Sequence, residues 1–262
     1  MGHSRFVLSC YARLVRSTVM VDRCYRLFDR LRSKYVLACA PDAFYEVYND
    51  LTYSNQAIYR ADAETFRASL FAFEERVIAR YFPPPPGTVL IGAAGGGREA
   101  FALGRRGYQV VAFEPAARLA ASMLRARGEF PIETFVGRYE DLPIVKSLAR
   151  PPIATDLRSR APFAAAIMGW VSLSHLRTDE LCIDALRQIG HLTRGPILVS
   201  SHPGDNSIGF SAHMGYYRGF SSADIGVLGE RAGLEIVYLD DGDNWPYAVF
   251  RATPSVRTAP SG

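Results

Sequence analysis

The feature that most constrains the fold is a regular alternation of short apolar segments and longer helical segments from residue 88 to residue 252. This alternation is typical of a parallel sheet with helices on both faces, because each helix returns the chain to the edge where the next strand begins. The last two strands are joined by turn residues, DDGDNWP (240–246), which predict an antiparallel pair. The sequence therefore predicts an α/β fold with a seven-stranded, mostly parallel sheet and an antiparallel last hairpin. The predicted strands are 88–92, 109–113, 132–136, 163–168, 196–201, 234–239 and 247–252. The predicted helices are 98–106, 116–127, 178–191, one beyond Glu140, and one that is capped by Ser221 or Ser222 and runs up to Gly233.

Three regions follow from the pattern along the chain. Residues 1–86 are predicted to be helical, residues 87–252 to form the α/β domain, and residues 253–262 to be a flexible polar tail. The helical region ends at four consecutive prolines, because proline has no backbone N–H and clashes with the preceding helical turn. Within it the sequence predicts a helix over 5–34, a short helix that starts at Pro41 and Asp42, and a third helix over 56–81 with Asn55 as its N-cap.

The first predicted helix has an apolar face and a basic face. The whole chain has a net charge of +4, but residues 1–35 hold eight basic residues and two acids, so the remainder carries −2. The pattern favours a helix that packs on the domain or forms a homodimer, and it also fits a helix on an anionic membrane surface or a targeting segment. The apolar face holds Val7, Tyr11, Leu14, Thr18, Val21, Tyr25 and Phe28, and the basic face holds Arg5, Arg16, Arg23, Arg26 and Arg30.

The composition excludes several classes of protein. With 262 residues, of which 48% are hydrophobic and 21% charged, the chain is typical of a globular protein with a sizeable core. We expect no membrane-spanning helix and no secretory signal. The cysteines, Cys10, Cys24, Cys39 and Cys182, lack metal-ligand spacing, so we expect free thiols, no metal and a cytoplasmic location. The mildly acidic body argues against a nucleic-acid partner.

The segment VLIGAAGGGREAF (89–101) joins the first predicted strand of the domain to its first helix through a cluster of small residues. Such a turn lets a ligand approach bare backbone. A P-loop is excluded because no lysine follows the glycines, and the dinucleotide pattern G-x-G-x-x-G is matched only weakly, by Gly92, Ala94 and Gly97. The segment resembles the first motif of class I S-adenosylmethionine-dependent methyltransferases. In that family G-x-G-x-G follows a strand that ends in an acid, and Ala93, Gly95 and Gly97 stand at those positions here.

Later segments support this resemblance. Glu114 ends the second predicted strand, where the family has an acid that accepts hydrogen bonds from the ribose hydroxyls. The run FAAAIMGWVSLSHL (163–176), the strand in GPILVSS (195–201) and the closing pair resemble strands four to seven of the methyltransferase fold. The resemblance covers about residues 87–252. It implies a Rossmann-like fold, S-adenosylmethionine as cofactor, and methyl transfer to an oxygen or nitrogen atom of a small molecule or peptide. A non-catalytic relative and a dinucleotide-binding oxidoreductase are the alternatives.

Three positions depart from the family pattern. Ile91 stands where the family has the acid of the first motif, and an isoleucine cannot bind the amino acid end of the cofactor. Ala93 replaces the first glycine. Arg138 follows the third strand, where the family usually has an acid that contacts the adenine amine. These departures leave open whether the chain binds the cofactor in an altered way or has lost catalysis.

The resemblance also implies roles for individual residues. His175 is the candidate catalytic base, and a structural role is its alternative. Methylation of nucleic-acid bases is disfavoured, because GWVS (169–172) replaces the N/D-P-P-Y/F motif and Cys182 lies inside a predicted helix. The candidate cofactor-binding residues are Ala93, Gly95, Gly96, Gly97, Glu114, Pro115, Arg138, Tyr139, Gly169 and Trp170. The candidate substrate-binding residues are Tyr48 and Tyr59 in the helical region, and His202, His213, Tyr216 and Tyr217 in a predicted inserted loop over 202–220.

Overall fold

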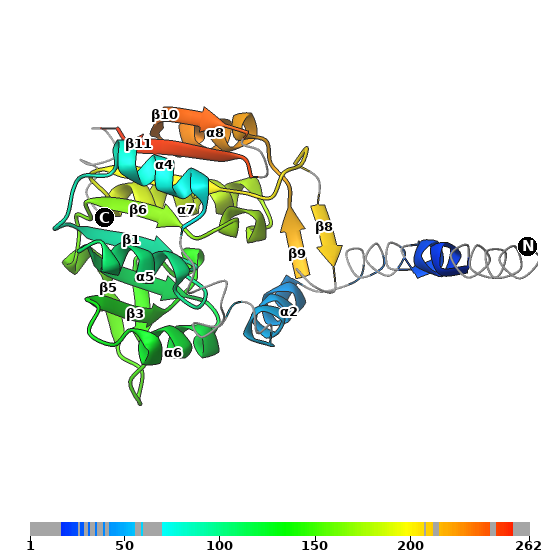
Figure 1. The fold of residues 1–262 in the computed structure, drawn as a ribbon, viewed down its shortest axis with the longest axis horizontal. Helices are drawn as coiled ribbons and strands as arrows, with labels where there is room; N and C mark the ends of the chain where they lie inside the picture. Colours follow the sequence, from blue (N-terminus) through cyan, green and yellow to red (C-terminus); the bar gives the residue numbers. More distant parts are fainter. Residues whose placement is uncertain are drawn as a thin grey trace, which may run out of the picture.

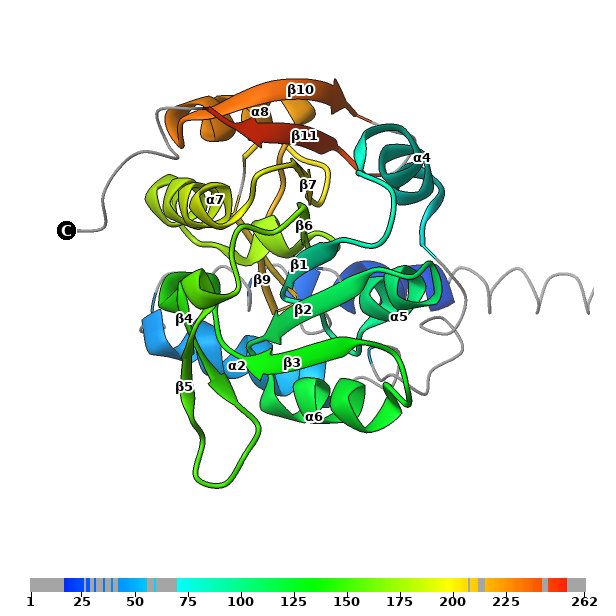
Figure 2. The same cartoon turned by 90° about the vertical axis from the view of Figure 1, so that its left-hand side faces the viewer.

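The computed structural model describes residues 17–25, 27, 28, 31, 35, 39, 42–55, 59, 70–206, 208–211, 215–241 and 245–253. The predicted strands correspond to β1 (Thr88–Gly92), β2 (Gln109–Glu114), β3 (Ile132–Val136), β6 (Ala165–Met168), β7 (Pro196–Ser200), β10 (Leu234–Asp240) and β11 (Tyr247–Ala252). They lie in the order β10-β11-β7-β6-β1-β2-β3 (Figure 1 and Figure 2). The strands from β7 to β3 pair in parallel, and β11 is antiparallel to both β7 and β10. The mostly parallel sheet with an antiparallel last hairpin is therefore confirmed.

Helices cover both faces of this sheet and divide its core into two layers (Figure 2). One layer contains α4 (Ala72–Tyr81), α5 (Arg98–Arg105) and α6 (Ala117–Ala126), and the other contains α7 (Asp179–Leu192) and α8 (Ser222–Arg231). Val89 and Ile91 of β1 face the first layer and Leu90 faces the second, as the two-residue period of a strand requires. Because α4 shares its core with β1, part of the region 1–86 packs as one body with the sheet. The division into three regions stays a prediction.

The segment after β3 differs from the sequence prediction. A helix was expected beyond Glu140, but a 3₁₀ turn (Tyr139–Asp141) is followed by a hairpin of β4 (Ile144–Ser147) and β5 (Ala154–Asp156). The hairpin extends the β3 edge, so the sheet has nine strands rather than seven. Pro143 stops helical growth at this point, since it has no N–H to donate. Val145 of β4 is fully buried while Ile144 is exposed, which is the alternation of a strand with one face on the core and the other in solvent.

Two other predicted segments need correction. Asn55 does not begin a helix but ends α2 (Asp42–Asn55), which starts where the sequence predicted a short helix. α4 begins only at Ala72, where the Phe71 N–H donates to the Glu74 carboxylate at 2.7 Å, and it ends at Tyr81 as predicted. The expected loop 202–220 contains a separate two-stranded sheet of β8 (Ile208–Ser211) and β9 (Gly215–Arg218). A hairpin built around glycines and tyrosines lacks the apolar pattern that would have revealed it.

The first predicted helix falls only partly within the described residues. Residues 17–25, 27, 28 and 31 are helical, and they stand away from the sheet, in dark blue in Figure 1. Val21 and Phe28 of the predicted apolar face are each 65% exposed, so the domain does not bury them. Dimerisation and membrane contact stay predictions. Within the described parts of the chain, no helix is both long enough and apolar enough to span a bilayer.

Candidate active site

A cavity of about 350 Å³ opens at the carboxyl ends of β1, β2 and β6. In open α/β sheets this is the edge where ligands bind, because the strand ends and helix starts gather there. The α5 start and the turns after β2 and β6 form one end of the cavity. The other end is closed by side chains of α2, of β9 and of the 3₁₀ turn Ser172–His175. We call these the strand end and the cap end of the cavity.

The small residues after β1 divide between lining the cavity and packing the turn. Ala93 and Gly95 line the cavity with φ angles of 49° and 56°, in the left-handed region where glycine is the least strained residue. Gly96 and Gly97 do not line it. Gly97 has a φ of 97°, and a Cβ there would come within 2.7 Å of the Met123 side chain on α6. The absence of a side chain at Gly97 therefore allows α5 to pack closely against α6.

Glu114 is the last residue of β2 and anchors the turn after β1. Its Oε2 accepts from the Gly95 N–H at 2.8 Å, and its Oε1 accepts from the Ala116 N–H at 2.9 Å. Burial raises the pKa of this carboxyl to about 7, although the two backbone N–H groups favour the ionised form. Each carboxylate oxygen still has a second lone pair, so Glu114 can accept further hydrogen bonds from a ligand in the cavity.

The residues after β3 lie at the same wall but face different partners. Arg138 lines the cavity and pairs with Asp50 of α2 at 2.9 Å. Tyr139 also lines it, yet only 5% of its surface is exposed, and its hydroxyl shares a hydrogen bond with Ser172 Oγ at 2.8 Å. The Tyr139 ring lies against β1, since a Cβ on Gly92 would come within 2.5 Å of it. Tyr139 thus forms part of the cavity floor.

The backbone at the end of β6 is in close contact with the backbone at the end of β1. The Gly169 N–H donates to Gly92 O at 2.7 Å, and a Cβ on Gly169 would come within 2.4 Å of Ala93 O. Gly169 is thus needed for this close approach and does not line the cavity. Val171 follows with a φ of 51°, a strained value for a β-branched residue, and its N–H donates to Ser200 Oγ at 3.0 Å. Strain of this kind is common where side chains are held for function.

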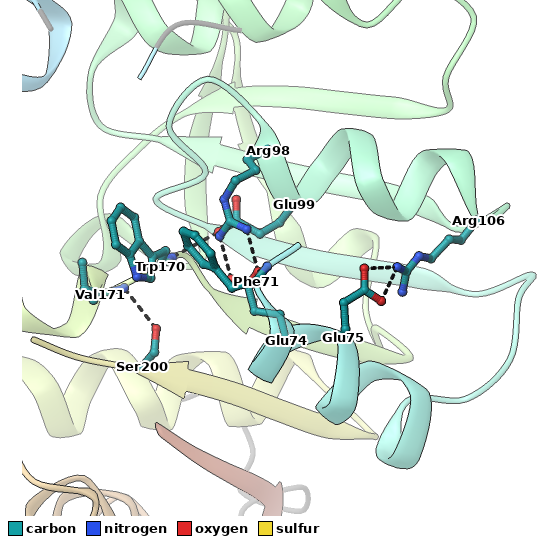
Figure 3. A network of polar contacts seen from close by, with 9 residues as sticks. All are labelled: Phe71, Glu74, Glu75, Arg98, Glu99, Arg106, Trp170, Val171 and Ser200. Carbon is teal, nitrogen blue, oxygen red and sulfur yellow. Dashed lines mark hydrogen bonds and ion pairs between the residues drawn. The ribbon is translucent and has the colours of Figure 1, made fainter. Parts of the chain in front are cut away.

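Trp170, which lies between Gly169 and Val171 in the sequence, lines the cavity. Its ring packs on Phe71 and on Trp245, each at a centroid distance of 5.0 Å. Its backbone N–H donates to Glu99 Oε1 at 3.2 Å (Figure 3). The indole Nε1 is buried and has no hydrogen-bond partner among the described residues. A buried donor of this kind is one that a ligand can satisfy.

A buried charge cluster of Glu74, Arg98 and Glu99 lies beside Trp170 (Figure 3). Two Arg98 nitrogens contact the two Glu74 oxygens at 2.6 Å each, and Arg98 Nη2 contacts Glu99 Oε1 at 2.8 Å. The guanidinium also lies 4.0 Å from the centre of the Phe71 ring. Sequence reasoning missed this cluster, because charges in the first turn of a helix ordinarily face solvent.

His175 lies at the cap end, where both of its ring nitrogens are engaged. Nδ1 donates to the Tyr216 carbonyl at 2.8 Å, which leaves Nε2 as the acceptor for the Tyr53 hydroxyl at 2.7 Å. Burial lowers the pKa of His175 and keeps the ring neutral. Burial is also the main reason that the pKa of the Tyr53 hydroxyl is raised. The two side chains therefore form a neutral donor–acceptor pair.

The remaining candidate substrate residues are only partly brought together. Tyr59, His202 and Tyr216 line the cavity, and burial lowers the pKa of His202 to about 4. Tyr217 does not line the cavity but packs on His202, at a centroid distance of 5.7 Å. Tyr48 packs on Phe44 and does not line the cavity. His213 lies outside the described residues.

Comparison with known proteins gives no match at the level of sequence: no protein-family model and no curated protein matches the chain. Solved structures do match. The CcbJ methyltransferase from Streptomyces caelestis has a TM-score of 0.55 at 17% identity, with 77% of this chain and 98% of that chain covered. The 1,6-didemethyltoxoflavin-N1-methyltransferase from Burkholderia thailandensis, solved with S-adenosylhomocysteine, has a TM-score of 0.57 at 18% identity, with 82% and 91% covered. A SAM-dependent methyltransferase from Leishmania major has a TM-score of 0.56 at 12% identity, with 79% and 82% covered.

The chain has the class I methyltransferase fold. The sheet order, the antiparallel β11 and the cavity at the carboxyl ends of the strands all agree with this assignment. The fold was correctly predicted from the sequence. The structure brings eleven of the candidate residues to one cavity: Ala93, Gly95, Glu114, Pro115, Arg138, Tyr139, Trp170, His175, Tyr59, His202 and Tyr216. The lining residues that it did not select include Asn49, Asp50, Tyr53, Arg98, Glu99 and Ser172.

Proposed function

We propose that this protein is an S-adenosylmethionine-dependent methyltransferase that acts on an oxygen or nitrogen atom of a small molecule or peptide. The observation that carries the proposal is the Glu114 carboxylate, which two backbone N–H groups anchor at the wall of the cavity. Its unused lone pairs suit the paired hydroxyls of a ribose. The similar proteins from S. caelestis, B. thailandensis and L. major are methyltransferases, and this likeness in fold supports the same reaction.

The residues of the strand end fit this cofactor. A cavity of about 350 Å³ is within the range of roughly 300–1,000 Å³ found for small-molecule and cofactor sites. Glu114 would hold the ribose, the turn from Ala93 to Gly95 would approach the cofactor with bare backbone, and Trp170 would line the reactive region. The cofactor supplies an electrophilic methyl group on a sulfonium sulfur when bound. The protein then has to align the acceptor atom and exclude water.

The residues of the cap end suit a planar acceptor that loses a proton. The aromatic residues Tyr59, His202 and Tyr216 line the cavity, which favours an aromatic or heteroaromatic molecule. We propose His175 as the base, reached through Tyr53. The acceptor would give its proton to the Tyr53 oxygen while the Tyr53 hydroxyl proton passes to His175 Nε2. The neutral state of His175 leaves Nε2 free to take that proton.

Calorimetry with S-adenosylhomocysteine and with NAD tests the cofactor assignment. We expect binding of S-adenosylhomocysteine and no binding of NAD. Tighter binding of NAD would assign the cavity to a dinucleotide, as in an oxidoreductase. The protein would be a non-catalytic relative if it bound S-adenosylhomocysteine but transferred no labelled methyl group to phenols, heteroaromatic amines, carboxylic acids or peptides.

We also propose partners and a location for the protein. The acidic body disfavours nucleic acid, and the described cysteines, Cys24, Cys39 and Cys182, are free thiols, as is usual in the cytoplasm. The exposed apolar residues of the N-terminal helix, such as Val21 and Phe28, suit a second copy of the chain better than solvent. We therefore propose a cytoplasmic enzyme that dimerises through this helix, with contact to a membrane surface as the alternative.

A further inference from the structure

The cluster of Glu74, Arg98 and Glu99 carries two carboxylates and one guanidinium. Each of the three side chains is no more than 5% exposed. When all three are ionised, the cluster has one negative charge in excess, and burial of an unpaired charge is strongly unfavourable. Burial accordingly raises the pKa of Glu74, even though Arg98 favours its ionised form. Such a cluster keeps a net negative charge unless a positive group lies beside it.

The cavity is the side from which a positive group can arrive. Arg98 and Glu99 line it, whereas Glu74 lies behind them and does not. Arg98 is directed at Glu74 with two nitrogens and reaches Glu99 with one of them (Figure 3). The ion pair of Arg98 and Glu99 therefore lies at the cavity wall, with Glu74 behind it.

One oxygen of Glu99 remains available. Oε1 accepts from Arg98 Nη2 at 2.8 Å and from the Trp170 N–H at 3.2 Å. Oε2 accepts no hydrogen bond from any described residue. A carboxylate that is held through one oxygen and has the other free at a cavity wall is a preorganised acceptor for an ammonium group.

We propose that Glu99 binds the α-ammonium group of S-adenosylmethionine, with Arg98 and Glu74 as the residues that hold it in position. This inference rests on the proposed function. It explains how the protein can bind the amino acid end of the cofactor with Ile91, rather than an acid, at residue 91. Ile91 is fully buried and faces the core between α5 and the sheet, so it has no access to a ligand. Glu99 supplies the missing negative charge from the first turn of α5.

The test compares two ligands on two proteins by calorimetry. The ligands are S-adenosylhomocysteine and its desamino analogue, which lacks only the α-amino group. The proteins are the natural chain and the variant Glu99→Gln, which keeps an oxygen for Arg98 and Trp170 but has no charge. We expect the natural chain to bind S-adenosylhomocysteine at least about tenfold more tightly than the analogue, and Glu99→Gln to bind the two within about twofold of each other.

Controls separate this inference from the proposed function and from misfolding. Glu75→Gln removes the carboxylate that pairs with Arg106, and neither residue lines the cavity. We expect this variant to keep the full preference for S-adenosylhomocysteine over the desamino analogue. Melting temperatures without ligand show that each variant is folded. A preference that survives in Glu99→Gln, or an equal loss of affinity for both ligands, would overturn the assignment of Glu99. No binding of either ligand by the natural chain would refute the proposed function itself, and the inference with it.

Discussion

The two ends of the cavity are built in different ways. At the strand end, Gly95 and Glu114 are joined by a hydrogen bond between residues 19 apart in the sequence, and neighbouring strands bring them together. At the cap end, Tyr53 meets His175 across 122 residues, and the Tyr216 N–H donates to Asn49 across 167. The strand end is therefore fixed by the sheet, whereas the cap end exists only when α2 docks on the 3₁₀ turn and on β9.

This difference predicts that substitutions at the two ends have separable effects. Changes at the strand end should alter the fold or the affinity for the cofactor. Changes at the cap end should leave the affinity for the cofactor intact and alter the attachment of α2 and the transfer step. Four predictions test the comparison, in order of decreasing expected effect.

The substitution Gly169→Ala should have the largest effect. Its Cβ would come within 2.4 Å of Ala93 O and 2.6 Å of Gly92 O, which are backbone atoms that cannot rotate away. We expect a loss of about 3 kcal/mol in the free energy of unfolding, measured by urea denaturation. A loss below about 1 kcal/mol would mean that the contact between the ends of β1 and β6 is not the rigid part of the site.

The substitution Glu114→Ala should weaken binding of S-adenosylhomocysteine by about 1.5–3 kcal/mol, because it removes charge-assisted hydrogen bonds to the ribose. Calorimetry at pH 8 measures this loss, and circular dichroism checks that the variant is folded. Glu114→Gln provides a matched control, since it keeps the acceptor oxygen without the charge and should lose less. Affinity equal to that of the natural chain would remove Glu114 from the ribose site.

The affinity should also depend on pH through Glu114. Burial raises the pKa of this carboxyl to about 7, so it is protonated below that pH and ionised above it. The ionised form accepts hydrogen bonds from ribose hydroxyls better, so we expect binding about tenfold weaker at pH 6 than at pH 8, or about 1.4 kcal/mol. The Glu114→Gln variant should lose this dependence. A dependence that persists in the variant would assign it to another group.

The smallest effect is expected at the cap end. The substitution Tyr53→Phe removes the hydroxyl that donates to His175 Nε2, at a cost of about 1 kcal/mol in the free energy of unfolding. Affinity for S-adenosylhomocysteine should stay within about twofold, whereas methyl transfer should slow if Tyr53 passes the proton to His175. A large loss of cofactor affinity would contradict the separation of the two ends. Unchanged transfer would leave His175 without its proposed proton path.

Much of the strand end could be predicted from the sequence because its residues lie close together along the chain. The strand ending at Gly92, the small residues after it and Glu114 lie within one strand–helix–strand unit, and parallel pairing determines which ends meet. Gly97, which the sequence analysis selected as a cofactor-binding residue, does not line the cavity. Its left-handed backbone was predictable from glycine, but its contact with Met123 depends on where α6 packs.

The sequence by itself determined the alternation of strands and helices, the parallel sheet with its reversed last strand, and the edge at which the cavity lies. These features depend on residue periodicity and on turn residues, which act over a few positions. Only the tertiary structure decided that Glu99 lies at the cavity wall paired with Arg98, that His175 has both nitrogens engaged, and that α2 closes the site. The reason is that burial and pairing of polar side chains depend on segments far apart in the chain, and a charge on a helix looks the same in sequence whether it faces water or a ligand.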